Sequence, residues 1–258
     1  MPTPDASFIE INTATFTGAV VQTIGQIDTY STPYVRTWPH ATTAVAGPRY
    51  PFNHVAGICT AQEIDEIYAD FPHQTTPFAF ECAPVCHHAQ DLIAFRQLGL
   101  APLSHSVVLV CDMTVLLPLR VRSNLVWMER ERLDDTPEEL PTDVDRIVRR
   151  AYRMQQDAHI VSLLQSDGII ASAGIRIADG YAFCFGAWVA PHRRRRGHYA
   201  TLLDARLQFA ADQGCHTVVL QTQTRSSVAA TAEERGFTVG WTRERWMPVH
   251  ERTRRASE

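Results

Sequence analysis

Residues 189–203, with the sequence VAPHRRRRGHYATLL, constrain the fold of this chain more than any other segment. An apolar run ends at Pro191, a basic turn with a single glycine (Gly197) follows, and the next residues repeat apolar side chains at helical spacing. The apolar face of the predicted helix carries Leu203, Leu207 and Ala210. The segment therefore predicts a strand that enters a helix through a short loop, a unit typical of folds with mixed helices and strands.

Such a loop is a suitable place for an anion. Backbone N–H groups at a helix N-terminus lack acceptors within the helix, and the helix dipole favours negative charge in front of them. Gly197 leaves the backbone open to a phosphate, and the guanidinium groups of Arg193–Arg196 add charge-assisted contacts. An arginine run can equally be a solvated turn or a patch for nucleic acid. Its position at a strand-to-helix junction favours the phosphate interpretation.

The composition excludes several classes of protein. The formal net charge of −4 argues against a nucleic-acid partner, and the absence of lysine leaves no side chain for Schiff-base chemistry. The longest apolar runs have about ten residues, whereas a membrane-spanning helix needs ~20. The first residues lack the basic and apolar regions of a secretory signal, and the six scattered cysteines are typical of free thiols in a reducing cytosol. We therefore expect a cytoplasmic protein with no nucleic-acid or membrane partner.

Residues 82–88, CAPVCHH, raise the possibility of a zinc site, because cysteine and histidine are the ligands that zinc prefers. No second pair of ligands with zinc spacing follows elsewhere in the chain. The segment also lies where a strand is predicted to end and a helix to begin. We therefore favour a structural junction here and expect no metal.

Periodicity predicts two successive sets of elements, separated near 118–145 by a polar, acidic stretch that contains prolines. The first set has helices at 13–28, 61–71 and 86–98 and strands at 52–58, 77–82 and 105–113, with Thr60 and Glu63 as a capping box. The second has strands at 124–130, 159–165, 168–177, 181–190, 216–222 and 237–247, and helices within 137–156, at 198–213 and at 226–235. Hairpin turns alternate here with strand-helix-strand units, so the expected fold is α/β or α+β with a mixed sheet.

The segment from Val189 to Leu203 resembles the pyrophosphate-binding loop of the GNAT superfamily of N-acetyltransferases, whose pattern is V-x-P-x-x-R-x-x-G-x-G/A-x-x-L. The order of elements across 124–247 and the pair Gly236 and Phe237 are similar to the same family. The resemblance implies a mixed, mostly antiparallel, twisted sheet flanked by helices. It further implies two tandem GNAT-like halves, a degenerate one at 1–118 and an acetyl-CoA-binding one at 119–258.

By this resemblance, the backbone amides from Arg195 to Ala200 would hold the pyrophosphate of acetyl-CoA. The pantetheine arm would pair with the end of the strand at 181–190, provided that this strand and 216–222 splay apart. The reaction implied is direct attack of an amine, most simply that of a small molecule, on the thioester through a tetrahedral intermediate. The cofactor-binding residues implied are Ala187, Trp188, Val189, Arg194, Arg195, Arg196, Gly197, His198, Tyr199 and Ala200.

The sequence departs from the family pattern at the residues that assist proton transfer. Phe183 stands where some members carry a glutamate base, Ala232 where many carry a tyrosine acid, and Arg225 replaces a frequent asparagine. Tyr199 replaces the second glycine or alanine of the loop, so its ring must point away from the phosphates. The remaining candidates for a base are His54, His192, His198, His216 and Glu244, and we take Glu244 as the candidate catalytic residue.

These departures leave two other interpretations open. The chain could bind acyl-CoA without catalysis, or it could keep the fold as an interaction protein. Either a monomer or a homodimer fits the sequence.

Overall fold

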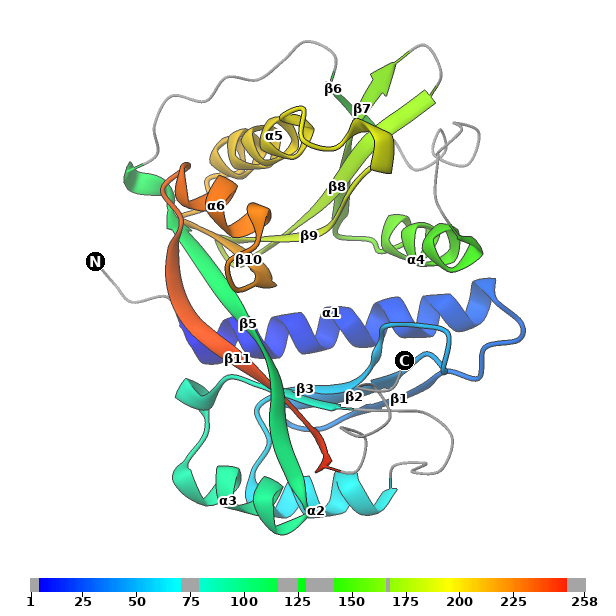
Figure 1. The fold of residues 1–258 in the computed structure, drawn as a ribbon, viewed down its shortest axis with the longest axis vertical. Helices are drawn as coiled ribbons and strands as arrows, with labels where there is room; N and C mark the ends of the chain where they lie inside the picture. Colours follow the sequence, from blue (N-terminus) through cyan, green and yellow to red (C-terminus); the bar gives the residue numbers. More distant parts are fainter. Residues whose placement is uncertain (1–4, 71–78, 116–124, 129–141, 166–167, 250–258) are drawn as a thin grey trace. The chain divides into compact units, whose positions relative to one another are not determined.

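A computed structural model describes residues 5–70, 79–115, 125–128, 142–165 and 168–249. The chain divides into two compact units (Figure 1). The first comprises Met1–Ser106 together with Trp241–Glu258, and the second comprises Val107–Gly240. The division thus differs from the two consecutive halves expected from the sequence, because the last strand returns to the first unit. The expected boundary at 118/119 lies outside the described residues.

In its described residues, the first unit contains α-helices α1, α2 and α3 and a sheet in the order β1-β2-β3-β4-β11. Its elements are α1 (Ala6–Ile27), β1 (Tyr34–Thr37), β2 (Ala41–Val45), β3 (Asn53–Gly57), α2 (Ala61–Asp70), β4 (Ala79–Cys82) and α3 (Ala89–Gln97). β5 (Leu100–Asp112) begins in this unit and β11 (Thr238–Pro248) ends in it. β3 and β4 are parallel, whereas the other neighbours run antiparallel, so the sheet is mixed as expected.

Helix α1 carries the principal charged pair of the first unit. Glu10, on this helix, is 1% exposed and accepts hydrogen bonds from Nε of Arg243 (2.8 Å) and from Nε1 of Trp241 (2.8 Å), both on β11. Burial by itself lowers the pKa of Arg243, but the Glu10 carboxylate outweighs it and holds that pKa above its ordinary value. Arg243 therefore stays charged inside the unit.

The second unit is built on a sheet in the order β5-β10-β9-β8-β7-β6. Its elements are β6 (Leu125–Met128), α4 (Asp143–Arg153), β7 (Ala158–Gln165), β8 (Gly168–Ala178), β9 (Tyr181–Val189), α5 (His198–Asp212), β10 (Thr217–Gln223) and α6 (Ser227–Glu233). Strands β6 to β9 form antiparallel pairs, and β9 pairs with β10 in parallel. The mixed sheet with flanking helices confirms the predicted fold class.

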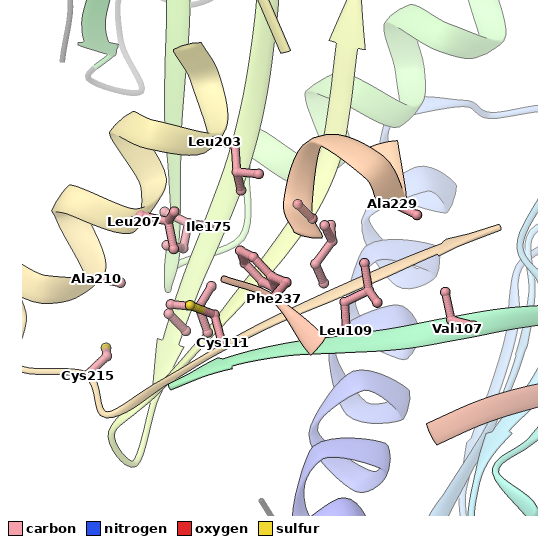
Figure 2. Close-up of a cluster of buried hydrophobic side chains, with 14 residues drawn as sticks. Val107, Leu109, Cys111, Ile175, Leu203, Leu207, Ala210, Cys215, Ala229 and Phe237 are labelled. Atoms are coloured by element: carbon pink, nitrogen blue, oxygen red, sulfur yellow. The ribbon is translucent and has the colours of Figure 1, made fainter. Parts of the chain in front are cut away.

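Helices α5 and α6 cover one face of this sheet. The predicted apolar face of α5 is fully buried at Leu203, Leu207 and Ala210. These side chains meet Phe237 and the inward side chains of β5 and β8 in one core, which Figure 2 shows. The core fixes α5 over the sheet, and with it the position of the loop that leads into the helix.

Helix α4 lies on the opposite face. On β8, Ala171 and Ala173 pack against α5, so Ser172 between them points the other way. The Arg149 guanidinium of α4 donates to the Ser172 hydroxyl and lies 5.1 Å from the Trp188 ring on β9. The sheet of the second unit is therefore covered on both faces.

The structure corrects three details of the expected elements. Helix α1 begins at Ala6 rather than at residue 13, capped by the Asp5 carboxylate, and strands β1 and β2 were not predicted. At 82–88 the chain forms the expected junction as a 3₁₀ turn, Pro84–Cys86, so the helix expected at 86–98 begins at Ala89. There the His87 ring accepts from the Cys59 amide (3.3 Å) and contacts the Ala83 carbonyl (3.1 Å), so it connects backbone segments.

Three further observations bear on the exclusions drawn from composition. All six cysteines are free thiols. Within the described ranges, no cluster of three or more His, Cys, Asp or Glu side chains could hold a metal ion. No helix in that part of the chain is long and apolar enough to cross a bilayer.

Replacing Glu10 by alanine should destabilise the first unit strongly, because it leaves the buried Arg243 guanidinium without its counter-charge. We expect the free energy of unfolding to fall by about 3–5 kcal/mol, measured by urea denaturation. Glu66→Gln, at an exposed carboxylate of the same unit that accepts from Gln62, is the control and should change it by less than about 0.5 kcal/mol. Equal effects of the two substitutions would contradict a structural role for the pair.

Candidate functional site

A cleft opens in the second unit where β9 and β10 part. Their parallel pairing joins Tyr181–Cys184 to Thr217–Leu220 and, within the described chain, does not continue beyond Cys184 and Leu220. The cleft has a volume of about 640 Å³ and is lined by the end of β9, the loop after it, the first turns of α5, the end of β10 and α6. The splay between the two strands that the resemblance required is therefore present.

A bulge in β9 shapes one wall of the cleft. The register between β8 and β9 shifts near Gly174, opposite Phe185, and Gly186 has a positive φ of 56°. A Cβ at Gly186 would come within 3.2 Å of the Tyr152 ring, so the position suits glycine in both conformation and space. Ala187, directly after the bulge, is exposed on the cleft wall.

The loop between β9 and α5 has the backbone conformation of an anion site. Arg195 and Gly197 both adopt positive φ, 61° and 79°, with Arg196 in an ordinary conformation between them. Alternation of this kind turns successive N–H groups toward a common concavity. The first hydrogen bond of α5 joins the Thr201 N–H to the Gly197 carbonyl (3.0 Å), so the amides just before Thr201 are those that helix geometry leaves without an intrahelical acceptor.

Arginines surround the mouth of this loop. Arg194, Arg195 and Arg196 are exposed, and Nε of Arg194 donates to the Val189 carbonyl (3.2 Å), which connects the loop to the end of β9. Nearby positive charge adds to the dipole of α5, so the loop favours a polyanion.

Cys184, Tyr199 and Arg206 line the cleft near the last pair of β9 with β10, Cys184 with Leu220, and we call these three residues its floor. The Tyr199 ring turns toward Arg206, whose Cζ lies 5.7 Å from the ring centroid. Burial raises the pKa of the Tyr199 phenol and of the Cys184 thiol, although the charge of Arg206 opposes both shifts. Both groups are therefore neutral at pH 7, and Arg206 is the charged member of the floor.

The structure brings the predicted cofactor-binding residues together. All of them except Arg196 line the cleft, namely Ala187, Trp188, Val189, Arg194, Arg195, Gly197, His198, Tyr199 and Ala200. Arg196 is exposed and is not among the lining residues.

The candidate bases are placed less favourably. Of them, only His198 lines the cleft, and His192 is exposed beside the loop. His216 holds the 178–180 turn, since its amide donates to the Gly180 carbonyl (2.9 Å) and its ring packs edge-on against Tyr181. Glu244 and His54 belong to the first unit, where Glu244 accepts from Nε1 of Trp246 (2.9 Å) and His54 lies 3.9 Å from Glu81. Phe183 and Ala232, at the positions of the family's base and acid, are both buried.

Sequence reasoning missed the far wall and the floor. Gln221, Thr222, Ser227, Val228 and Thr231 line the cleft from β10 and α6, and Cys184 and Arg206 lie at its floor. Arg206 had a detectable signal, because it falls on the same helical face as Leu203 and Ala210, where a charge interrupts an apolar stripe. The other residues come together only through the register of β10 and α6.

Residues 125–237 match the model of the acetyltransferase (GNAT) family. The match assigns this segment, and not the whole chain, to the GNAT family. Among solved structures, a GCN5-related N-acetyltransferase from Kribbella flavida is 15% identical with a TM-score of 0.59, over 92% of this chain and 95% of that one. A tandem GNAT protein from the clavulanic acid biosynthesis pathway is 10% identical with a TM-score of 0.58, over 95% of each chain. No curated protein matches this sequence.

These similarities concern the fold and extend beyond the GNAT domain, because the two alignments cover more than 90% of the chain. A protein described as an acetyltransferase of the GNAT family from Novosphingobium aromaticivorans has a TM-score of 0.55 at 15% identity, over 83% of this chain and 91% of that one. The expected resemblance to the GNAT family, tandem members included, is thus confirmed.

Substituting Gly186 by alanine should alter both stability and the cleft. The positive φ costs a non-glycine residue about 1–2 kcal/mol of unfolding free energy, and the added methyl displaces the wall that Ala187 forms. Gly214→Ala is the matched control, since Gly214 also has positive φ (70°) but open space around it and no place in the cleft. We expect similar losses in urea denaturation, but weaker binding of desulfo-CoA only for Gly186→Ala. Unchanged affinity would show that the bulge does not shape the binding wall.

Proposed function

We propose that the protein transfers an acetyl group from acetyl-CoA to the amine of a small molecule. The observation that carries this proposal is the coincidence of the splayed strands with the loop at Arg195–Ala200, both opening on one cleft of the GNAT domain. The pyrophosphate of acetyl-CoA matches the loop, and the extended pantetheine arm matches the space between the splayed strands.

The loop supplies the affinity for phosphate in this proposal. N–H groups ahead of Thr201 donate to the pyrophosphate oxygens, and Arg194 and Arg195 add charge from the rim. The edge of β9 beyond Cys184 offers backbone donors and acceptors to an extended arm, much as a strand edge accepts another strand. The N–H at Ala187, beside the bulge, then donates to the thioester carbonyl oxygen.

Transfer needs no covalent intermediate on the protein. The amine nitrogen attacks the thioester carbon, a C–N bond forms, and the C–S bond breaks as the electron pair leaves with sulfur. One proton is lost from nitrogen and the thiolate of CoA can receive one, so the reaction balances without a further reactant. Orientation in the cleft supplies several kcal/mol of the barrier reduction.

A non-catalytic acyl-CoA-binding role is the second candidate, and the burial of Phe183 and Ala232 at the family's acid and base positions favours it. Calorimetry with desulfo-CoA tests binding, and thiol release from acetyl-CoA over a library of small amines tests catalysis. Binding together with thiol release supports the enzyme. Binding alone supports the second candidate, and absence of binding rejects both.

Gly197→Glu should abolish binding of desulfo-CoA, because it places a carboxylate where the pyrophosphate is proposed to lie. Gly236→Glu is the matched control, since Gly236 likewise has positive φ (85°), open space and no position in the cleft. We expect a loss of at least about 100-fold in affinity for the first variant and none for the second, by calorimetry. Wild-type affinity in Gly197→Glu would mean that the loop does not hold the phosphates.

Glu244→Gln tests the candidate base. An amide oxygen can still accept from Trp246, so we expect the fold to be preserved. If Glu244 removes the proton from the amine, thiol release should slow by about 100-fold, with unchanged affinity for desulfo-CoA. Wild-type turnover would remove Glu244 from the mechanism.

A further inference from the structure

Arg206 is a buried cation on the floor of the cleft. Its side chain is 0% exposed and lines the cleft together with Cys184 and Tyr199. Nε donates to the Leu202 carbonyl one helical turn earlier (3.3 Å), whereas the buried Nη1 and Nη2 face the neutral Tyr199 phenol and are paired with no carboxylate within the described part of the chain. The two terminal nitrogens are the groups with which a guanidinium binds an oxyanion.

No anion in the described residues neutralises Arg206. Asp204, the nearest acidic residue along α5, is paired with Arg235. The Tyr199 phenol, whose ring lies under the guanidinium, and the Cys184 thiol are polar neighbours that burial keeps neutral. Arg206 therefore contributes a positive charge to the lining of the cleft.

Two other buried arginines, unlike Arg206, form a described ion pair. Arg243 is paired with Glu10 in the first unit, and Arg176 with Asp157 in the second. Burying a guanidinium without a counter-charge is costly, and an apolar side chain would continue the stripe of Leu203 and Ala210. An anionic group that enters the cleft would recover this cost.

The location limits what that group can be. Pyrophosphate is proposed to lie at the Arg195–Ala200 loop, whereas Arg206 lies at the floor beside Cys184, the last residue of β9 that pairs with β10. Since the loop is assigned to the pyrophosphate, we assign the group beside Arg206 and Cys184 to the reacting end of a ligand. A carboxylate has the charge and the two acceptor oxygens that match Nη1 and Nη2 of Arg206.

We propose that Arg206 binds a carboxylate on one of the two reacting ligands. This inference rests on the proposed function and adds a substrate class to it: either the acyl group of the CoA thioester ends in a carboxylate, or the acceptor amine carries one. In the first case a carboxyacyl group is transferred: the amine nitrogen bonds to the thioester carbon, the C–S bond breaks, and the terminal carboxylate stays intact. In the second, the same bonds change and the acceptor's carboxylate stays intact.

Calorimetry tests whether the acyl group of the CoA thioester carries the carboxylate. We expect wild-type protein to bind succinyl-CoA at least about tenfold more tightly than acetyl-CoA if the acyl group carries the carboxylate. Arg206→Met should reduce that ratio to about one while leaving the affinity for desulfo-CoA within about twofold. Arg176→Met, which removes a buried arginine that has its own partner outside the cleft, should retain the wild-type ratio.

The acceptor side is tested by thiol release from acetyl-CoA with amino acids and with the corresponding amino acid amides. If the acceptor carries the carboxylate, wild-type kcat/KM should favour the acids by at least about tenfold, and Arg206→Met should abolish that preference. Equal use of acids and amides together with equal affinity for succinyl-CoA and acetyl-CoA overturns the inference. The inference is also overturned if Arg206→Met weakens the binding of desulfo-CoA as much as the binding of each thioester. Arg206 would then contact the part of CoA that all these ligands share.

Two further measurements keep the outcomes distinct. Failure of wild-type protein to bind desulfo-CoA rejects the proposed function itself, whereas binding without any carboxylate preference rejects only the role of Arg206. Thermal unfolding of ligand-free Arg206→Met should give a melting temperature equal to or above that of the wild type, since an unneutralised buried charge is removed. A lower melting temperature means that Arg206 is structural; Arg206→Lys, which keeps the charge, must then retain part of the preference for the inference to stand.

Discussion

The parting of β9 from β10 is the constraint on which the site depends. Parallel pairing holds the two strands together as far as Cys184 and Leu220, and beyond that point the backbone of β9 has one bonded neighbour, β8, instead of two. Unsatisfied strand edges are costly when buried and useful when a ligand completes them. The bulge at Gly186 occurs in the same stretch, two residues beyond the last residue of β9 that pairs with β10.

The loop depends on this geometry through the packing of α5. Leu203, Leu207 and Ala210 fix the helix to the sheet core, which holds its N-terminus over the open end of β9. The positive φ values at Arg195 and Gly197 complete the turn from strand to helix in a few residues. The splay of β9 from β10 and the cluster of backbone amides in the loop are therefore two results of the same packing arrangement.

Features encoded locally could be predicted from the sequence, and features that need tertiary register could not. The loop at 193–197, the apolar face of α5 and the Thr60–Glu63 capping box each lie within a few residues, and the structure has all three. β2 was missed because all five of its residues are buried and show no alternation. The return of β11 to the first unit, which places Glu244 there, follows from its pairing with β4, a contact between residues more than 150 positions apart.

Arg206 could be predicted only in part. Its helical position was readable, because residues 199, 203, 206 and 210 share one face of α5, yet the sequence alone does not tell whether a charge on an apolar stripe is paired. The structure answers this by placing Asp204 against Arg235 and two neutral groups, Tyr199 and Cys184, against Arg206. Tyr199 thereby has a physical reason to replace a small residue of the loop, because its ring packs against the Arg206 guanidinium. A chain that has Phe183 and Ala232 at the usual proton-transfer positions can then gain specificity from charge at the floor of the cleft, where a ligand's anion is desolvated and Coulomb interactions are strongest.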